Sequence, residues 1–408
     1  MTVANSSMDK VLVGRHAIFG LEQEVFAYEL LYRNGEANQA NFTDGDQATA
    51  RVMLNALLEI GLDRIVGNQL AFINMTAGFI LGNCCEELPK GRVVLEVLED
   101  VQADPEVVAA LTRLSSQGYQ IALDDFCFRE DLLPLVEIAH IIKLDVMAMD
   151  RDEIQRQLEI LQPYSVKLLA EKVETQEDFD FCKELGFDYF QGFFFCRPNI
   201  VEGAVIPANQ AAIMSLLAKL QDSDTGMKEL EEIIRQDLSL SHKVLKYVNS
   251  AFFALPKSVD SIRQAACMVG VHRLKTWATL ITLASMGNKP MELLVTCLVR
   301  AKMCEQLAVA RNDADPEQFF TVGMFSVLDG LFDQPLSQLI VDLKLSPDVT
   351  KALLEYQGIL GKVLGCVIAY DQGNWESIES VDLEESAVRE SYLEAIAWMT
   401  TLVPLLKD

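Results

Sequence analysis

The first half of the chain alternates short apolar runs with longer helical segments, and this alternation restricts the fold more than any other feature. The step from one run to the next is about 20–27 residues, which is the period of β/α units in a parallel sheet. Extended segments near Val11–Val13 and Phe26–Leu31 bring the number of strands to about eight. The pattern therefore predicts an α/β fold closed as a TIM-like (β/α)₈ barrel. The six runs of strand character are Ala71–Met75, Val93–Leu98, Gln120–Leu123, Ile141–Leu144, Lys167–Ala170 and Tyr189–Phe195.

The second half of the chain has a different pattern, in which helical periodicity replaces the strand runs. Segments such as Gln210–Leu220, Met227–Arg235 and Thr296–Ala310 space their apolar residues as an amphipathic helix does. Polar stretches with Pro and Gly separate these segments. We therefore predict two domains, a barrel over residues 1–200 and an all-helical domain over residues 201–408.

The charge of the chain excludes several classes of partner. There are 60 acidic residues and 34 basic residues, which give a formal net charge of −26. Such a surface repels polymeric nucleic acid and anionic lipid, because phosphate binding needs clustered Lys and Arg. The nine cysteines have no CxxC spacing, as in thiols of a reducing compartment. With no signal peptide and no apolar run of about 18 residues, we expect a cytoplasmic protein that does not enter a membrane.

Polar residues stand at the carboxyl end of nearly every predicted strand. In a parallel barrel these ends meet on one face, where loops build active sites. So many carboxylates repel one another unless cations lie between them, and Mg²⁺ or Mn²⁺ prefers oxygen ligands. The pattern predicts two such ions, a pair suited to phosphodiester hydrolysis. The residues are Glu29, Asn74, Glu96, Asp124, Asp125, Lys143, Glu171 and Gln191.

Each of these residues also has a simpler interpretation. A single Asp or Glu at a strand end is commonly a helix N-cap or a surface charge. Lys143 on its own could form an ion pair with Asp145. The repetition at the same position on successive strands is what favours a functional site.

At these residues the first half resembles the EAL domain family of cyclic di-GMP phosphodiesterases. YELLYR at Tyr28–Arg33 is similar to the EALxR signature, FINMT carries Asn74, and LEVLE carries Glu96. The motifs ALDDF, IIKLD, AEKVET and FDYFQGFFFCRP follow in the order of the family. The resemblance implies metal ligands at Glu29, Asn74, Glu96, Asp124, Asp125 and Glu171, and catalytic roles for Glu171, Lys143 and Gln191.

The resemblance also implies contacts with cyclic di-GMP and a residue that supports a loop. The ligand-binding positions are Leu31, Arg33, Asp145 and Pro198, and the loop-supporting position is Glu174. The chain departs from the family at two places near the metal ligands. A Gly- and Ser-rich loop follows DDF in the family, whereas Cys127–Asp131 reads CFRED here, and Lys172 replaces a glycine. These departures bear on turnover more than on binding, because glycine gives the backbone freedom that other residues lack.

The second half resembles the HDOD domain, a relative of HD-type phosphohydrolases. The stretch Val244–Met286 carries the VNSA, LP and tryptophan elements of that family, including Asn249, Pro256 and Trp277. None of the four histidines is followed by Asp, so the His-Asp pair that bridges metals in HD enzymes is absent. The resemblance implies that this domain binds an unidentified protein partner and performs no hydrolysis.

Three functions follow from these observations. The first is metal-dependent hydrolysis of cyclic di-GMP to the linear dinucleotide pGpG by the barrel, with the helical domain as regulator. The second is a catalytically inactive sensor or adaptor that binds cyclic di-GMP and acts through the helical domain. The third is hydrolysis of another phosphodiester. A homodimer is consistent with the family, although the altered loop lies where that contact is expected.

Overall fold

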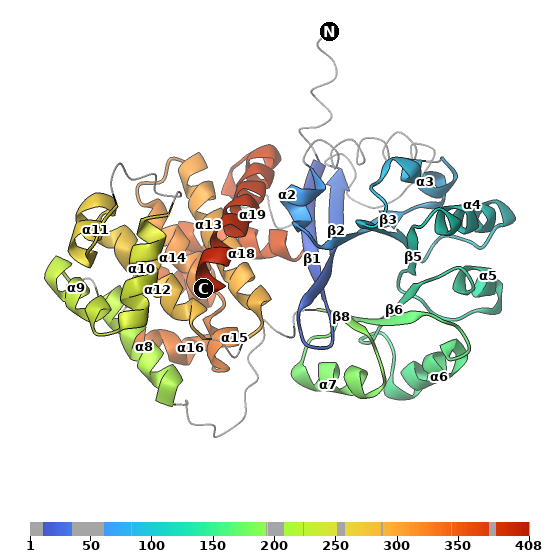
Figure 1. Ribbon diagram of the computed structural model, residues 1–408, viewed down its shortest axis with the longest axis horizontal. Helices are drawn as coiled ribbons and strands as arrows, with labels where there is room; N and C mark the ends of the chain where they lie inside the picture. Colours follow the sequence, from blue (N-terminus) through green and yellow to red (C-terminus); the bar gives the residue numbers. More distant parts are fainter. Residues whose placement is uncertain are drawn as a thin grey trace, which may run out of the picture. The chain divides into compact units, whose positions relative to one another are not determined.

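The computed structural model describes residues 11–34, 61–82, 84–192, 194, 208–222, 224–250, 258–286, 289–343, 345–374 and 381–407. The chain divides into two compact units. One unit contains the chain up to residue 195 together with residues 370–375 and 384–389, and the other contains the remainder. Figure 1 shows strands only in the first of these units, among the described residues.

The first unit is a closed barrel whose eight strands follow one another in chain order, as predicted. Each strand from β2 to β7 is parallel to the strand that follows it. The strands are β1 (Val11–Phe19), β2 (Val25–Asn34), β3 (Leu70–Met75), β4 (Val93–Val97), β5 (Gln120–Leu123), β6 (Ile141–Asp145), β7 (Lys167–Glu171) and β8 (Tyr189–Gln191).

The expectation of an all-parallel sheet was wrong for β1. This strand is antiparallel to both of its neighbours, β2 and β8. Only the stretch Gly20–Glu24 joins β1 to β2. A parallel connection needs a crossover of about a dozen or more residues, so this short link makes a hairpin instead.

Helices cover the outside of the barrel in the intervals between strands (Figure 1). Two of the longer ones begin at side-chain caps: the Asp150 side chain accepts from the Glu153 amide, and Thr175 forms a capping box with Asp178. The elements are α2 (Leu62–Val66), α3 (Ala77–Leu81), η2 (Cys84–Glu87), α4 (Pro105–Ser116), η3 (Glu130–Leu132), α5 (Leu133–Val136), α6 (Arg151–Leu161) and α7 (Gln176–Glu184).

One layer of the barrel core lies directly beneath the polar strand ends. Its members come from β1 to β7 and are all buried. Successive strand residues face opposite sides, so residues two apart face the same side. On each strand the core residue is two positions from a polar residue that therefore also points into the barrel. The layer consists of Ile18, Ala27, Phe72, Val94, Ala122, Ile141 and Leu169.

The second unit is helical throughout the residues that the structure describes, as predicted. Its core contains an aromatic group in which the rings of Tyr247, Phe320 and Trp398 lie within 6.5 Å of the Trp277 ring. The helices are α8 (Ala208–Gln221), α9 (Met227–Arg235), α10 (Leu238–Val248), α11 (Ile262–Val269), α12 (Val271–Ala284), α13 (Met291–Ala310), α14 (Pro316–Phe325), α15 (Leu328–Phe332), α16 (Leu336–Leu339), η4 (Ile340–Leu343), α17 (Pro347–Glu355), α18 (Gly358–Asp371) and α19 (Glu385–Lys407).

One segment, Pro347–Asp371, has the length and apolar composition of a membrane span. Half of its most apolar window is buried inside the protein. Tyr356 and Gly358 both have positive φ angles, at 54° and 70°, and they end α17 before α18 begins. Neither helix alone reaches the roughly 20 residues that a bilayer requires, so the segment fits the core of a helical domain.

Candidate active site

The strand ends of the barrel gather the side chains that the sequence predicted. Register pairs Asn74 of β3 with Glu96 of β4, and Asp145 of β6 with Glu171 of β7. Glu29 on β2, Lys143 on β6 and Gln191 on β8 are buried. All of them are on the face where parallel strands end, which is the position of active sites in barrels of this kind.

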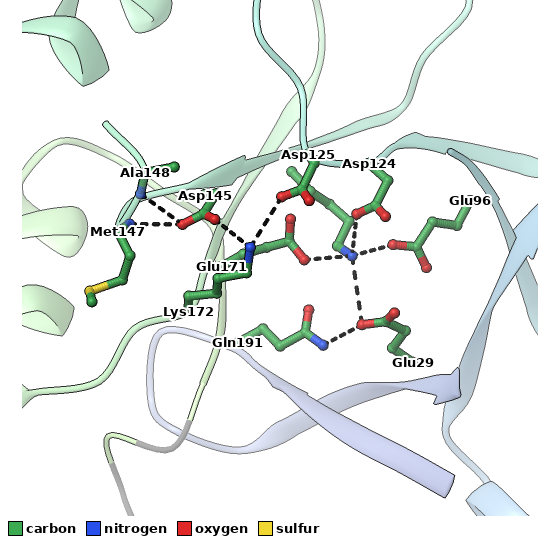
Figure 2. A network of polar contacts seen from close by, with 11 residues as sticks. Glu29, Glu96, Asp124, Asp125, Asp145, Met147, Ala148, Glu171, Lys172 and Gln191 are labelled. Carbon is green, nitrogen blue, oxygen red and sulfur yellow. Dashed lines mark hydrogen bonds and ion pairs between the residues drawn. The ribbon is translucent and has the colours of Figure 1, made fainter. Parts of the chain in front are cut away.

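Lys143 is the centre of this group. Its Nζ lies 2.8 Å from Asp124 Oδ1, 2.7 Å from Glu171 Oε1 and 3.7 Å from Glu29 Oε2, and it also contacts Glu96 Oε1. The Lys143 side chain is 1% exposed. Figure 2 shows that the four carboxylates approach from different strands. One ammonium thus faces four carboxylates in a buried space, which leaves an excess of negative charge there.

Burial and this excess of charge shift the pKa values of the group. Burial raises the pKa of Glu171 to about 8 and the pKa of Glu96 well above its ordinary value, and Lys143 only partly opposes both shifts. Burial alone would lower the pKa of Lys143, but the surrounding carboxylates raise it well above the ordinary value. Lys143 therefore stays charged, and without a further cation the raised pKa values of Glu96 and Glu171 favour protonation of these two carboxylates.

Four buried oxygen atoms at the site have no hydrogen-bond partner: Asn74 Oδ1, Glu96 Oε2, Glu171 Oε2 and Gln191 Oε1. Unsatisfied buried acceptors are costly, and hard divalent cations take such oxygens as ligands. Among the described residues, no three Asp, Glu, His or Cys side chains are already arranged around one ion-sized point. The unpartnered oxygens fit a divalent ion as ligands. In this structure the Lys143 ammonium occupies the space between the carboxylates.

Asp145 is paired with a different lysine from the one that the sequence suggested. The alternative interpretation of Lys143 as a partner of Asp145 was wrong, because Lys143 bonds four other carboxylates. Lys172 Nζ contacts Asp145 Oδ2 and lies 3.7 Å from Asp125 Oδ1. Figure 2 shows the Lys172 side chain linked to both carboxylates. Asp125 and Lys172 both have positive φ angles, 39° and 57°. Hydrogen bonding to Asp145 raises the pKa of Lys172.

Gln191 joins β8 to this network and reveals a residue that sequence reasoning missed. Its Nε2 lies 2.5 Å from Glu29 Oε2 and 3.1 Å from His16 Nδ1. His16 is two residues from the core residue Ile18 on β1, so both face the barrel interior. Burial lowers the pKa of His16, which favours the neutral ring. The hairpin between β1 and β2 was the signal that could have placed His16 here.

The loop after Asp125 is held by backbone contacts. The Phe126 amide donates to the Lys143 carbonyl over 2.9 Å, and the Phe128 amide donates to Gln157 Oε1 over 3.0 Å. Gln157, on α6, is 4% exposed. The chain Cys127–Asp131 is therefore tied to the neighbouring helix through a buried amide that sequence reasoning also missed.

The remaining predicted residues have mixed outcomes. Leu31 and Glu174 are half-buried. Arg33 belongs to β2, but its side chain is outside the described part of the structure, as are Pro198 and Pro256. In the helical unit, the Asn249 side chain donates to the Val259 carbonyl and accepts from the Val259 amide, which ties the end of α10 to Val259. That role is structural, as is the packing of Trp277 in the aromatic group.

Comparison with known sequences agrees with this architecture. The chain matches the EAL domain family over residues 79–198 and the HDOD domain family over residues 206–332. It is 33% identical to the uncharacterized protein YuxH of Bacillus subtilis, over 97% of this chain and 99% of YuxH. It is 32% identical to cyclic di-GMP phosphodiesterase CdgJ of Vibrio cholerae, over 96% of this chain and 93% of CdgJ. The chain therefore belongs to this family of two-domain proteins, in which an EAL domain precedes an HDOD domain.

Solved structures of EAL proteins are similar to the barrel at low identity. The PaMucR phosphodiesterase in complex with c-di-GMP is 22% identical, with a TM-score of 0.38, over 50% of this chain and 99% of that one. YkuI of Bacillus subtilis, in complex with c-di-GMP and calcium, is 19% identical, with a TM-score of 0.38, over 65% of this chain and 73% of that one.

Proposed function

We propose that the barrel hydrolyses cyclic di-GMP to linear pGpG with the help of divalent metal ions. The observation that carries the proposal is the buried Lys143 ammonium with four carboxylates on it, beside four unsatisfied oxygens. The name of CdgJ, at 32% identity over 96% of this chain, supports cyclic di-GMP as the substrate.

The proposed ligands of Mg²⁺ or Mn²⁺ are Glu29, Asn74, Glu96, Asp124, Asp125 and Glu171. An ion held by these residues supplies Lewis acidity toward the phosphodiester and neutralises its charge. The sequence predicted two ions. Whether the second ion binds depends on Lys172, whose ammonium already lies beside Asp125 and Asp145.

The proposed work of the chain's own groups is proton transfer and orientation. The Oε2 atom of Glu171 has no hydrogen-bond partner, which leaves it open to accept a proton from an attacking water. Lys143 keeps the carboxylates in place and stays positively charged close to the developing phosphorane. Gln191 orients Glu29 through the bond to Oε2. Leu31, Arg33, Asp145 and Pro198 are the proposed contacts with the dinucleotide, and Glu174 is the proposed support of the loop.

The helical domain is the proposed regulatory module, which binds a protein partner. The proposed location is the cytoplasm, where cysteines stay reduced. Consistent with this, the seven cysteines whose side chains the structure describes are all free thiols. A homodimer is a separate prediction, and light scattering of the full chain tests it by measuring the mass in solution.

Product analysis tests the enzymatic proposal directly. The full chain is incubated with cyclic di-GMP and Mn²⁺, and linear pGpG is followed by chromatography beside a Glu171→Gln variant. We expect product from the wild-type protein and at least a hundredfold less from the variant, since removal of a general base costs about 10²–10⁴ in rate. Equal product from both proteins, or none from either, would contradict the proposal.

A catalytically inactive adaptor is the second candidate, and the loop after Asp125 favours it. Phe128 and Arg129 stand where the family has glycines and small hydroxyls, and the Phe128 amide is fixed to Gln157. Under this hypothesis the degenerate loop stops turnover while the ligand still binds. Calorimetry with cyclic di-GMP distinguishes the candidates: binding heat without product supports the adaptor, and no heat with or without Mn²⁺ removes cyclic di-GMP from both.

A further inference from the structure

Lys172 divides the acidic site into two halves that differ in their need for a cation. Its Nζ contacts Asp145 Oδ2 and lies 3.7 Å from Asp125 Oδ1. The other oxygen of Asp145 accepts the amides of Met147 at 2.9 Å and Ala148 at 3.0 Å. Both oxygens of Asp145 are therefore satisfied by the protein itself, as Figure 2 shows.

The other half of the site is not satisfied in this way. The unsatisfied buried oxygens belong to Asn74, Glu96, Glu171 and Gln191, which surround Lys143. Glu96 is completely buried and Gln191 is 2% exposed, so solvent cannot satisfy them. Each side already has one ammonium, but Lys143 faces four carboxylates whereas Lys172 faces two. The unmet demand for positive charge is therefore on the Lys143 side.

We propose that Lys172 is a resident cation that takes the place of a second metal ion at the Asp125–Asp145 pair, so that the protein holds one divalent ion tightly. This inference rests on the proposed metal-dependent function and changes the number of ions in it. A divalent ion at this pair must displace the ammonium from Asp145 and then bear the repulsion of a positive charge next to it. Lys172 therefore acts as a positioning residue that sets how many ions the site holds.

The conformation of Lys172 makes the inference testable by substitution. Its φ angle of 57° is one that glycine adopts without strain, so Lys172→Gly removes the ammonium and leaves the backbone unstrained. Lys172→Met removes the charge and keeps most of the length of the side chain. Lys167→Met is the matched control, because Lys167 begins β7, the strand that ends one residue before Lys172, and pairs with Asp188.

The experiment counts Mn²⁺ ions on the full chain by calorimetry and by electron paramagnetic resonance. We expect one tightly bound, magnetically isolated ion in the wild type and in Lys167→Met. In Lys172→Gly and Lys172→Met we expect two ions and a spin-coupled spectrum, since paired metals in such sites are about 3.5–4 Å apart. Circular dichroism of each variant checks its fold.

Three other results are possible, and they have different meanings. Two coupled ions in the wild type would overturn the role of Lys172 and leave the proposed function standing. One ion in all four proteins would likewise overturn it, because removal of the ammonium would then create no second site. No bound Mn²⁺ in any protein, with no pGpG formed, would instead refute the metal-dependent function on which the inference rests.

Discussion

Lys143 is a buried lysine whose ammonium is surrounded by carboxylates. Its ammonium is in contact with or close to three carboxylates on β2, β4 and β7 and a fourth just after β5, and its side chain is 1% exposed. Such a group stabilises the protein only while its partners remain, because an unpaired buried charge is expensive. The same carboxylates that are proposed for the chemistry of the site therefore also keep Lys143 stable in the barrel.

We predict that Lys143→Met destabilises the metal-free protein by about 3–5 kcal/mol at pH 7.5, because four buried carboxylates lose their counter-charge. The loss is smaller at pH 5.5, where the raised pKa values of Glu96 and Glu171 favour their neutral forms. Urea unfolding of the EDTA-treated protein measures both values. Lys167→Met, which breaks an exposed pair with Asp188, is the control and costs less than about 1 kcal/mol. Equal losses in the two variants would show that the ammonium of Lys143 is not needed for stability.

The raised pKa of Glu171 predicts how stability depends on pH. The folded-state pKa is about 8, above the ordinary value of 4.5. A proton that is bound more tightly in the folded state stabilises that state. This stabilisation is complete at pH values below the unfolded-state pKa and disappears as the pH rises through the folded-state pKa. The metal-free protein should therefore lose stability between pH 5 and pH 8.5.

Glu171→Gln tests the assignment of this effect, since its amide does not titrate. We expect a flatter stability curve over the same range, measured by urea unfolding in EDTA. If both proteins show the same slope, the proton belongs to another carboxylate of the group.

The grouping of most of these side chains could be predicted from the sequence, because polar residues recur at the ends of successive strands and such ends meet on one face of a barrel. The ion pair of Lys172 with Asp145 could not, although both residues stood out in the sequence. Register places Asp145 opposite Glu171, one position before Lys172. In the sequence, Asp145 is much closer to Lys143 than to Lys172, and this proximity favoured the wrong partner.

At the scale of elements, the end of β8 depends on one glycine. A Cβ at Gly192 would lie 2.0 Å from the Val173 carbonyl oxygen, and the φ angle of Gly192 is 152°. The Val173 amide donates to the Gln191 carbonyl over 2.9 Å, so the two strand ends are in direct contact. Gly192 therefore sets the distance between Gln191 and the segment that carries Lys172.

We predict that Gly192→Ala destabilises the barrel by more than about 3 kcal/mol, because overpacking is added to backbone strain. Gly186→Ala is the control, since Gly186 also has a positive φ angle, 90°, but nothing within 4 Å of its Cβ position. The control should cost about 1–2 kcal/mol from strain alone. Thermal unfolding of the two variants compares the costs. If they are equal, the contact with Val173 relaxes without cost.

Strand direction and buried helices were the parts of the fold that sequence patterns could not give. Alternation of apolar and polar residues is the same in both directions of a strand, so only the short link of Gly20–Glu24 identifies β1 as antiparallel. Helix α14 is buried on several sides at Phe319, Phe320, Val322, Met324 and Phe325. A helix without a polar face has no amphipathic period to detect.

At the scale of the whole molecule, the two compact units should respond differently to metal. The proposed ligands are all in the first unit. We predict that Mn²⁺ at about 100 times its Kd stabilises this unit by about 2.7 kcal/mol. In calorimetry its transition should rise by about 5–10 °C. The unfolding transition of the second unit should not move. The control is Mn²⁺ with EDTA in excess, which removes the free metal ion. If all transitions move together, the two units unfold as one.

The reversed first strand also determines where the chain enters the barrel. Val11 pairs with Asn34, at the end of the barrel where the acidic side chains lie. In a barrel with every strand parallel, the first strand would begin at the opposite end. A fluorescent protein joined ahead of β1 would therefore be tethered at the mouth of the site. Energy transfer from such a reporter to a dye-labelled dinucleotide would measure occupancy of the site in living cells.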